Sequence, residues 1–224
     1  MKKRKKFYIY LFRHGQTSYN KNHIFTGWDD PKLTSLGKRQ VHTIALRLRS
    51  KKIGIAIQTR LSRSGDSLHE VLRFHPECRR ILTDDRMIER NYGKLNGVSH
   101  DEFIRGMGKQ EYDLLKEGDA IGDLSVEKRR RVEKLLGKEE FDAIHRGYSV
   151  RPPGGESFKD VEKRVLSFIR DLKKLIAREQ ANVVISAHGN SIRLFRKIME
   201  GASREQATKW FIPYNRVFVY SVSV

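Results

Sequence analysis

Two short apolar segments of the chain each end in a His-Gly pair, and this arrangement constrains the fold more than any other feature. Residues 7–12 lead directly into Arg13-His14-Gly15, and residues 182–187 lead directly into His188-Gly189. Apolar runs of this length are typical of buried parallel strands, and in open α/β sheets binding sites form beyond the carboxyl ends of such strands. We therefore expect both histidines at one edge of one sheet.

Two arginines are expected at the same edge. Arg13 accompanies His14, and Arg63 follows a third strand-like stretch at residues 53–58. Guanidinium groups pair well with phosphate oxygens, and a neutral imidazole is a nucleophile toward phosphorus when its other ring nitrogen is held as a donor. The sequence predicts a phosphate pocket in which His14 is the nucleophile. Arg13, Arg63 and His188 would hold the phosphoryl group.

A leaving alkoxide needs a proton, which a carboxylic acid in a closed site can supply. Glu89 is the best-placed carboxyl group by its order along the chain, although spacing alone does not distinguish it from Asp84 or Asp85. A structural role is the alternative, in which Glu89 pairs with Arg86 or Arg90. Three carboxyl groups therefore stay open as the proton donor.

Composition favours one soluble globular domain over residues 1–224. Hydrophobic residues make up 38% and charged residues 33% of the chain, which is typical of a folded domain with a charged surface. The single Cys78 allows no intrachain disulfide, and the basic opening precedes an apolar run of only six residues, at 7–12. We expect a cytoplasmic protein. His69-Glu70 lacks the second histidine of a zinc protease motif, so no catalytic metal is expected.

The net charge of +19 predicts an anionic partner. A field of this sign steers small anionic substrates and attracts nucleic acid or anionic membranes without specificity. The basic run at residues 128–131 has no interleaved aromatic residues for base stacking. We expect a small phosphorylated substrate, no specific nucleic acid and no membrane partner, and a homo-oligomer is compatible with the sequence.

Strand-like and helix-like segments alternate along the chain, which indicates an α/β fold. Helices are expected after Thr34, from about Ser62, after a capping box formed by Ser157 and Asp160, after His188, and after Ser203. A loop is expected at residues 20–33, a short strand at 81–82 and a closing strand at 216–222. Residues 90–153 carry several glycines among charged helical stretches, and we expect a helical insertion across the sheet edge.

Three segments resemble the cofactor-dependent phosphoglycerate mutase branch of the histidine phosphatase superfamily. They are RHGQTSYNKNHIFTGWDDPKLTSLG at residues 13–37, ERNYGKLNG at 89–97 and AHGNSIR at 187–193. RHG with a distant HG is typical of the superfamily, whereas TGW, ERxYG followed by LxG, and HGNS are more particular to the mutase branch. The similarity covers most of the chain.

The resemblance implies a three-layer α/β/α sandwich with a mostly parallel sheet and a helical insertion over the active site. It also implies a phosphohistidine on His14, Glu89 as proton donor and acceptor, and His188 as a support for the phosphoryl group in transit. 2,3-Bisphosphoglycerate would prime the enzyme, without a metal. The other implied site residues are Arg13, Asn20, Thr26, Gly27, Arg63, Arg90, Tyr92, Gly189 and Asn190.

The chain departs from the mutase pattern at two positions that would bind the far end of a phosphorylated acid. His100 stands where these mutases carry lysine, and His145-Arg146 stands where they carry an arginine pair. Arg146 matches the second arginine of that pair, so His100 and Arg146 complete the implied substrate site. Cations that could compensate are Arg105, Lys109 and Arg151.

Three functions follow from these patterns. The first is interconversion of 3-phosphoglycerate and 2-phosphoglycerate, an isomerase reaction of glycolysis and gluconeogenesis. The second is a histidine phosphatase that hydrolyses small phosphorylated metabolites, which the replaced His100 and His145 favour. The third is a basic nucleic-acid-binding protein without enzymatic activity, which leaves the coincidence of the motifs unexplained.

Overall fold

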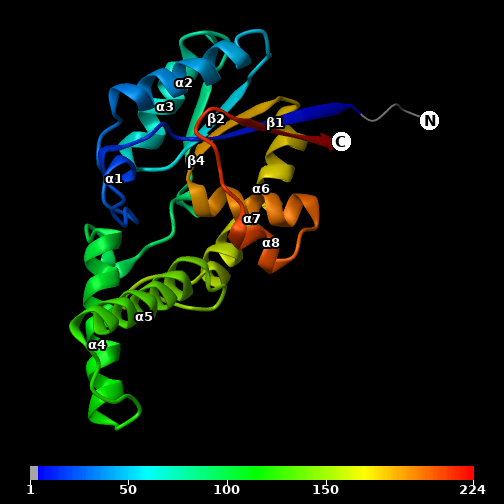
Figure 1. Cartoon of the computed structure of the whole chain (residues 1–224). Coiled ribbons are helices and arrows are strands. Elements are labelled where there is room, and N and C mark those ends of the chain that lie inside the picture. Colours follow the sequence, from blue (N-terminus) through cyan, green and yellow to red (C-terminus); the bar gives the residue numbers. More distant parts are fainter. Residues whose placement is uncertain (1–4) are drawn as a thin grey trace.

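A five-stranded sheet forms the centre of the computed structural model, which describes residues 5–224 (Figure 1). The opening residues 1–4, part of the basic segment noted above, lie outside this range. The strand order is β3-β2-β4-β1-β5. The first four strands in this order pair in parallel, and β5 pairs antiparallel with β1. The expected α/β class with a mostly parallel sheet is confirmed. The strands are β1 (Lys6–Arg13), β2 (Ile55–Gln58), β3 (Arg80–Thr83), β4 (Val183–Ala187) and β5 (Val217–Ser223).

Helices cover both faces of the sheet because alternate side chains of each strand point to opposite faces. In β1, Ile9 and Leu11 belong to one buried cluster, whereas Tyr10 and Phe12 belong to another. The first cluster includes residues of α6 (Phe158–Glu179) and α7 (Gly189–Glu200), and the second includes residues of α2 (Ser35–Leu48) and α3 (Ser62–Leu72). The chain therefore forms three layers, α/β/α.

Helix starts follow the capping residues that the sequence indicates. The Thr34 side chain accepts from the Gly37 N–H at the start of α2, and Ser157 forms a capping box with Asp160 at the start of α6. Ser203 caps α8 (Arg204–Lys209). The loop expected at residues 20–33 begins later than predicted, because a short helix, α1 (Ser18–Lys21), precedes it.

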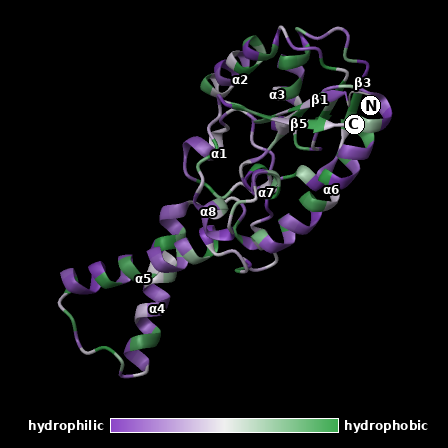
Figure 2. Cartoon of the chain, turned by 90° about the vertical axis from the view of Figure 1, so that its right-hand side faces the viewer, coloured by the Kyte–Doolittle hydropathy of each residue, from purple (hydrophilic) through white to green (hydrophobic). Residues whose placement is uncertain are grey.

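Two long helices between residues 90 and 153 form a hairpin that extends away from the sheet (Figures 1 and 2). They are α4 (His100–Glu117) and α5 (Val126–Arg146), preceded by the 3-10 turns η1 (Asp85–Met87) and η2 (Gly93–Leu95). A side chain at Gly108 or Gly137 would overlap a carbonyl of the facing helix, so these glycines let the two backbones approach closely. No helix within residues 5–224 combines the length and the apolar character needed to cross a membrane.

The base of this hairpin, and not its tip, lies against the sheet domain. Phe25, Tyr92, Phe103 and Ile144 form a third buried cluster there. As a result, the first residue of α4 and the last residues of α5 stand next to the carboxyl edge of the sheet.

Candidate active site

His14 follows directly on β1, and its backbone N–H donates to the Ala187 carbonyl at the end of β4. The imidazole is buried, with 2% of the residue exposed. Its Nδ1 lies 2.7 Å from the Gly15 carbonyl oxygen. Because a carbonyl oxygen only accepts, Nδ1 carries the proton and the lone pair is on Nε2. Gly15 is required at this turn because a Cβ there would overlap the Gly37 carbonyl.

His188 follows directly on β4 at the same edge, so the two histidines lie together as expected. Their ring centroids are 5.0 Å apart. The Nε2 atom of His188 lies 2.8 Å from the Thr59 hydroxyl oxygen, whereas Nδ1 is buried and has no hydrogen-bond partner within residues 5–224. Because a hydroxyl can donate or accept in this contact, Thr59 fixes the orientation of the ring and not the position of its proton.

Burial and nearby cations keep both imidazoles neutral. Burial lowers the pKa of His14 well below its usual value, and the charges of Arg63 and Arg13 lower it further. The pKa of His188 is lowered in the same way, first by burial and then by Arg63. A neutral imidazole with a free lone pair is the form required for attack on phosphorus.

Arg63 lies on α3 and is fully buried. Its Nη1 donates to the Asp29 carbonyl at 2.5 Å and its Nη2 to the Gly27 carbonyl at 2.9 Å, whereas Nε is buried without a partner within residues 5–224. Burial lowers the pKa of Arg63 to about 10, so the guanidinium stays charged at neutral pH. The loop that carries Gly27 therefore fixes this cation beside His14.

Arg13 is positioned by the segment between α8 and β5. Its Nη1 donates to the Ile212 carbonyl at 3.2 Å, and its guanidinium stacks on the Tyr214 ring with 4.1 Å between the guanidinium carbon and the ring centroid. Its Nε is buried and without a partner in the described part of the chain. Chain segments far apart in sequence therefore hold the two arginines beside the histidines.

Glu89 follows η1 and points into the same region, with 7% of the residue exposed. Its Oε1 accepts from the Arg90 backbone N–H at 2.8 Å and from the Asn190 backbone N–H at 3.0 Å. Asn190 lies in the first turn of α7, where N–H groups lack partners within the helix. These two bonds fix the carboxyl group and leave Oε2 for a substrate oxygen.

The structure distinguishes Glu89 from the other two acidic candidates. Asp84 forms a 2.7 Å salt bridge with Arg86, and Asp85 forms a 2.7 Å salt bridge with Arg60. Neither lines the cavity that His14 lines, whereas Glu89 does. The alternative pairing of Glu89 with Arg86 is not observed.

Arg90 points away from the site. Its guanidinium donates to the carbonyls of Glu156 and Val150, and it packs on the Tyr92 ring with 5.0 Å to the centroid. It is fully buried and is not among the residues that line the cavity. Arg90 therefore supports the wall of the site from behind, which differs from the expected contact with substrate.

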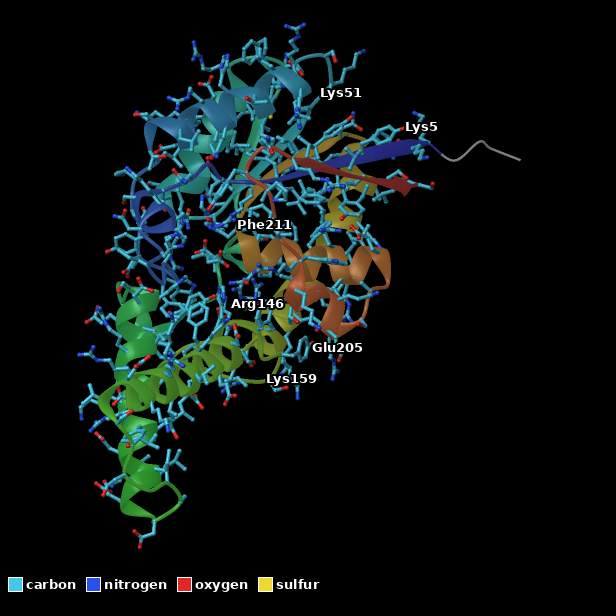
Figure 3. The ribbon with its side chains drawn as sticks, viewed as in Figure 1. Lys5, Lys51, Arg146, Lys159, Glu205 and Phe211 are labelled. Carbon is cyan, nitrogen blue, oxygen red and sulfur yellow. The ribbon has the colours of Figure 1, made fainter. Side chains whose placement is uncertain are left out.

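A cavity of about 370 Å³ joins these groups. Figure 3 labels two of the residues that line it, Arg146 at the end of α5 and the exposed Phe211 in the segment that leads to β5. His188 stands behind His14 and does not itself line the cavity. The expected residues that line it are Arg13, His14, Asn20, Thr26, Gly27, Arg63, Glu89, Tyr92, His100, Arg146, Gly189 and Asn190.

Sequence reasoning missed one cation of the cavity. Arg193 lines it and is only 8% exposed. It lies three residues after Asn190, so helical spacing from that residue could have found it. The cations expected to compensate do not reach the cavity, since Lys109 pairs with Asp113 and Arg151 with Asp160, and Arg105 is not among the lining residues.

Four residues form what we call the distal side of the cavity: His100, His145, Arg146 and Arg193. They come from the base of the α4–α5 hairpin and from α7. Burial lowers the pKa of His100 to about 4, and burial together with Arg146 lowers that of His145 to about 3. Both positions that depart from the mutase pattern are therefore neutral in the structure. Within residues 5–224, no group of three or more His, Cys, Asp or Glu side chains is arranged to hold a metal ion.

The buried histidines make a prediction for acid stability. Because folding lowers the pKa of His14 and His188, the unfolded chain binds protons below about pH 6.5 that the folded chain does not. The free energy of unfolding should fall as the pH drops, by about 1.4 kcal/mol per histidine between pH 7.5 and 5.5. Urea denaturation at pH 7.5 and 5.5 measures the loss. Between these two pH values, the free energy of unfolding of the His14→Asn variant should fall by about 1.4 kcal/mol less than that of the parent. An equal fall in the two proteins would contradict this account.

Comparison with known proteins agrees with this geometry. The family model of the histidine phosphatase superfamily (branch 1) matches residues 9–136 and 105–223. The chain belongs to the histidine phosphatase superfamily. Among its relatives, the 2,3-bisphosphoglycerate-dependent phosphoglycerate mutase of Methylobacterium sp. (strain 4-46) is 30% identical over 203 residues, which cover 88% of this chain and 82% of that protein. The mutase of the same name from Mesorhizobium japonicum is 29% identical over 205 residues, 90% of this chain and 85% of that protein.

Solved structures of this superfamily share the fold. The phosphoglycerate mutase from Bacillus anthracis superposes with a TM-score of 0.69 at 17% identity, covering 98% of this chain and 89% of that one. The alpha-ribazole phosphatase from Shigella flexneri superposes with a TM-score of 0.68 at 19% identity, covering 95% and 89%. One fold therefore carries both a mutase and a phosphatase, and the site must distinguish the two activities in this enzyme.

Proposed function

We propose that this enzyme is a phosphoglycerate mutase that interconverts 3-phosphoglycerate and 2-phosphoglycerate through a phosphohistidine on His14. The observation that carries the proposal is the charge of the cavity. Arg13 and Arg63 act on His14, Arg146 and Arg193 stand on the distal side, and Glu89 is the one acidic side chain among the described lining residues. Two arginine pairs suit a substrate with two separate anionic groups, as a phosphoglycerate has.

In the first step, Nε2 of His14 attacks the phosphorus atom of a phosphomonoester, and the bond from phosphorus to the ester oxygen breaks. Arg13 and Arg63 donate to the equatorial oxygens, where charge develops in the transition state, and the His188 ring supports His14 from behind. Because backbone carbonyls already hold both guanidinium groups, these donors need little reorganisation during the transfer. Oε2 of Glu89 donates the proton that the leaving oxygen requires.

In the second step, an acceptor hydroxyl takes the phosphoryl group from His14. Glu89, now ionised, removes the proton of that hydroxyl, so the carboxyl group returns to its starting state. For a mutase, the acceptor is the other hydroxyl of the glycerate. Retention of the substrate through both steps depends on the distal side, where Arg146 and Arg193 hold its far end.

We propose 2,3-bisphosphoglycerate as the primer, which would supply the phosphoryl group that first loads His14. Buried donors without a partner in the described chain, Nε of Arg13 and Nε of Arg63, stand at the His14 end. Arg146 and Arg193 line the same cavity. These four arginines would hold its two phosphates and its carboxylate.

A coupled assay tests the proposal. We expect conversion of 3-phosphoglycerate to 2-phosphoglycerate to rise strongly when a catalytic amount of 2,3-bisphosphoglycerate is added, and phosphate release to stay a minor fraction of turnover. The same reactions followed for phosphate release and for isomer formation give the ratio directly. Hydrolysis without isomerisation would contradict the mutase assignment.

A phosphatase is the second candidate, and the neutral distal histidines favour it. His100 and His145 replace cations that would retain a second anion, and the pKa of each is far below neutral. In that case water takes the phosphoryl group from His14, with Glu89 as the base. Phosphate release from 3-phosphoglycerate in the absence of bisphosphate would identify this activity.

A further inference from the structure

The two arginines of the distal side, Arg146 and Arg193, form no salt bridge within residues 5–224. Arg146 Nη1 donates to the Thr208 carbonyl at 2.7 Å, and Arg193 Nε donates to the Trp210 carbonyl at 2.7 Å. Arg193 also donates to the Asn190 side-chain oxygen. These acceptors are uncharged, and neither arginine has a carboxylate within salt-bridge distance in residues 5–224. Each guanidinium has five N–H groups, so each keeps donors for a ligand.

His145 stands beside these arginines without a hydrogen bond to its ring within residues 5–224. Its imidazole packs on Phe141 with 5.0 Å between the centroids, and it lines the cavity. Its ring also meets Phe25 at 6.2 Å and Tyr92 at 6.4 Å. Its centroid also lies 5.7 Å from that of His100, and the ring lines one cavity with both arginines.

We infer that Arg146, Arg193 and His145 form one anion site, and that His145 takes up a proton from solvent when a substrate anion binds there. The inference deepens the proposed function, because the anion would be the far end of the phosphorylated acid. It assigns His145 a role that a lysine or arginine could not have. A fixed cation is charged before the ligand arrives, whereas this imidazole becomes charged with it.

The charges around His145 lower its pKa in the empty site, whereas a bound anion would raise it. Without a ligand, burial is the main cause that keeps His145 neutral, and positive neighbours add to it; the titratable groups that face the ring are Arg146, Arg193, His100, Arg90 and Tyr92. A carboxylate or phosphate bound between the two arginines reverses the balance. An opposite charge within about 4–6 Å raises a pKa by about 1–3 units, which brings His145 into the range of pH 4 to 6.

His145 is the proton acceptor in this inference because the neighbours of the two histidines differ. The arginines that would bind the anion act directly on His145. For His100 the main causes of the lowered pKa are burial and His23, and its ring lies against Phe25 and Phe141. His100 therefore serves as a matched control within the same cavity.

Binding of two probes that differ only at the far end tests the inference. 3-Phosphoglycerate carries a carboxylate where glycerol 3-phosphate carries an alcohol, and their phosphate groups titrate alike. The dissociation constants are measured by calorimetry on the His14→Asn variant, which excludes turnover. We expect the preference for 3-phosphoglycerate to grow about three- to fivefold between pH 7 and pH 5, with a matching uptake of protons from buffer.

Three variants test whether His145 takes up the proton. The preference for 3-phosphoglycerate over glycerol 3-phosphate should no longer increase between pH 7 and pH 5 in His145→Asn, and it should be independent of pH in His145→Lys. The increase should persist in His100→Asn. A preference that does not change with pH in the parent, or that changes equally in His145→Asn, overturns the inference. If His145→Asn does not fold, the titration of the His145 ring by NMR replaces it, and the ring should titrate at higher pH with 3-phosphoglycerate bound than with glycerol 3-phosphate.

The binding test is separate from the test of the proposed function. A pH-dependent preference with no phosphoryl transfer to His14 in the parent protein would overturn the mutase and keep the anion site. Isomerisation together with a preference for 3-phosphoglycerate that does not change with pH would keep the mutase and overturn the role of His145.

Discussion

Replacement of His14 by asparagine should lower phosphoryl transfer by about 10⁴-fold or more, since loss of an attacking group removes the covalent route altogether. Asparagine is the informative substitution because its amide can still donate to the Gly15 carbonyl, as Nδ1 of His14 does. The variant therefore keeps the turn after β1 while it removes the lone pair of Nε2. Turnover of 3-phosphoglycerate with bisphosphate present measures the loss.

A trapping experiment separates a nucleophile from a structural residue. With ³²P-labelled bisphosphate, the parent should retain label on the protein that is stable in base and lost in acid, as expected of a phosphohistidine. The His14→Asn variant should retain none. His69→Asn, on the exposed face of α3, is the matched control and should behave as the parent. Label on the His14→Asn variant at the parent's level would exclude His14 as the acceptor.

The elements that carry the site could be predicted from sequence because their signals are strong and local. β1 and β4 are apolar runs that end in His-Gly, and the structure pairs them in parallel with their ends together. The helices after Thr34 and Ser157 begin at the capping residues expected. The helix α1 was missed because four residues are too few to show a period, although Thr17 and Asn20 carry its capping signal.

Side-chain direction was harder to predict than residue identity. Glu89 and Arg90 are adjacent in an irregular segment between η1 and η2, and their side chains turn to different sides. Glu89 enters the cavity, and Arg90 turns to the carbonyls of Glu156 and Val150. A motif contains both residues without saying which of them faces the ligand.

The state of the distal histidines could not be predicted from the sequence either. The replacements at His100 and His145 are visible in the chain, but their burial depends on side chains from separate segments. Phe25 comes from the loop after α1 and Phe141 from α5, and only the folded hairpin base brings these rings against the imidazoles. Long-range packing of this kind leaves no local pattern.

Glu89→Gln should lower turnover of phosphoglycerate by about 10²- to 10⁴-fold, the usual contribution of a positioned acid or base. The amide oxygen of glutamine can accept from the Arg90 and Asn190 N–H groups as Oε1 does. The change therefore removes the exchangeable proton and keeps the geometry. Its effect should depend on the leaving group, because an alkoxide must be protonated as it departs, whereas p-nitrophenolate leaves without a proton.

Formation of the phosphoenzyme from p-nitrophenyl phosphate should accordingly fall less than about tenfold in Glu89→Gln, although the same variant is strongly impaired on phosphoglycerate. Asp84→Asn is the matched control, since Asp84 pairs with Arg86 and does not line the cavity. It should show no such dependence on the leaving group. An equal loss on both substrates in Glu89→Gln would mean that the carboxylate orders the first turn of α7 through Asn190, and the proton would then have to come from another group.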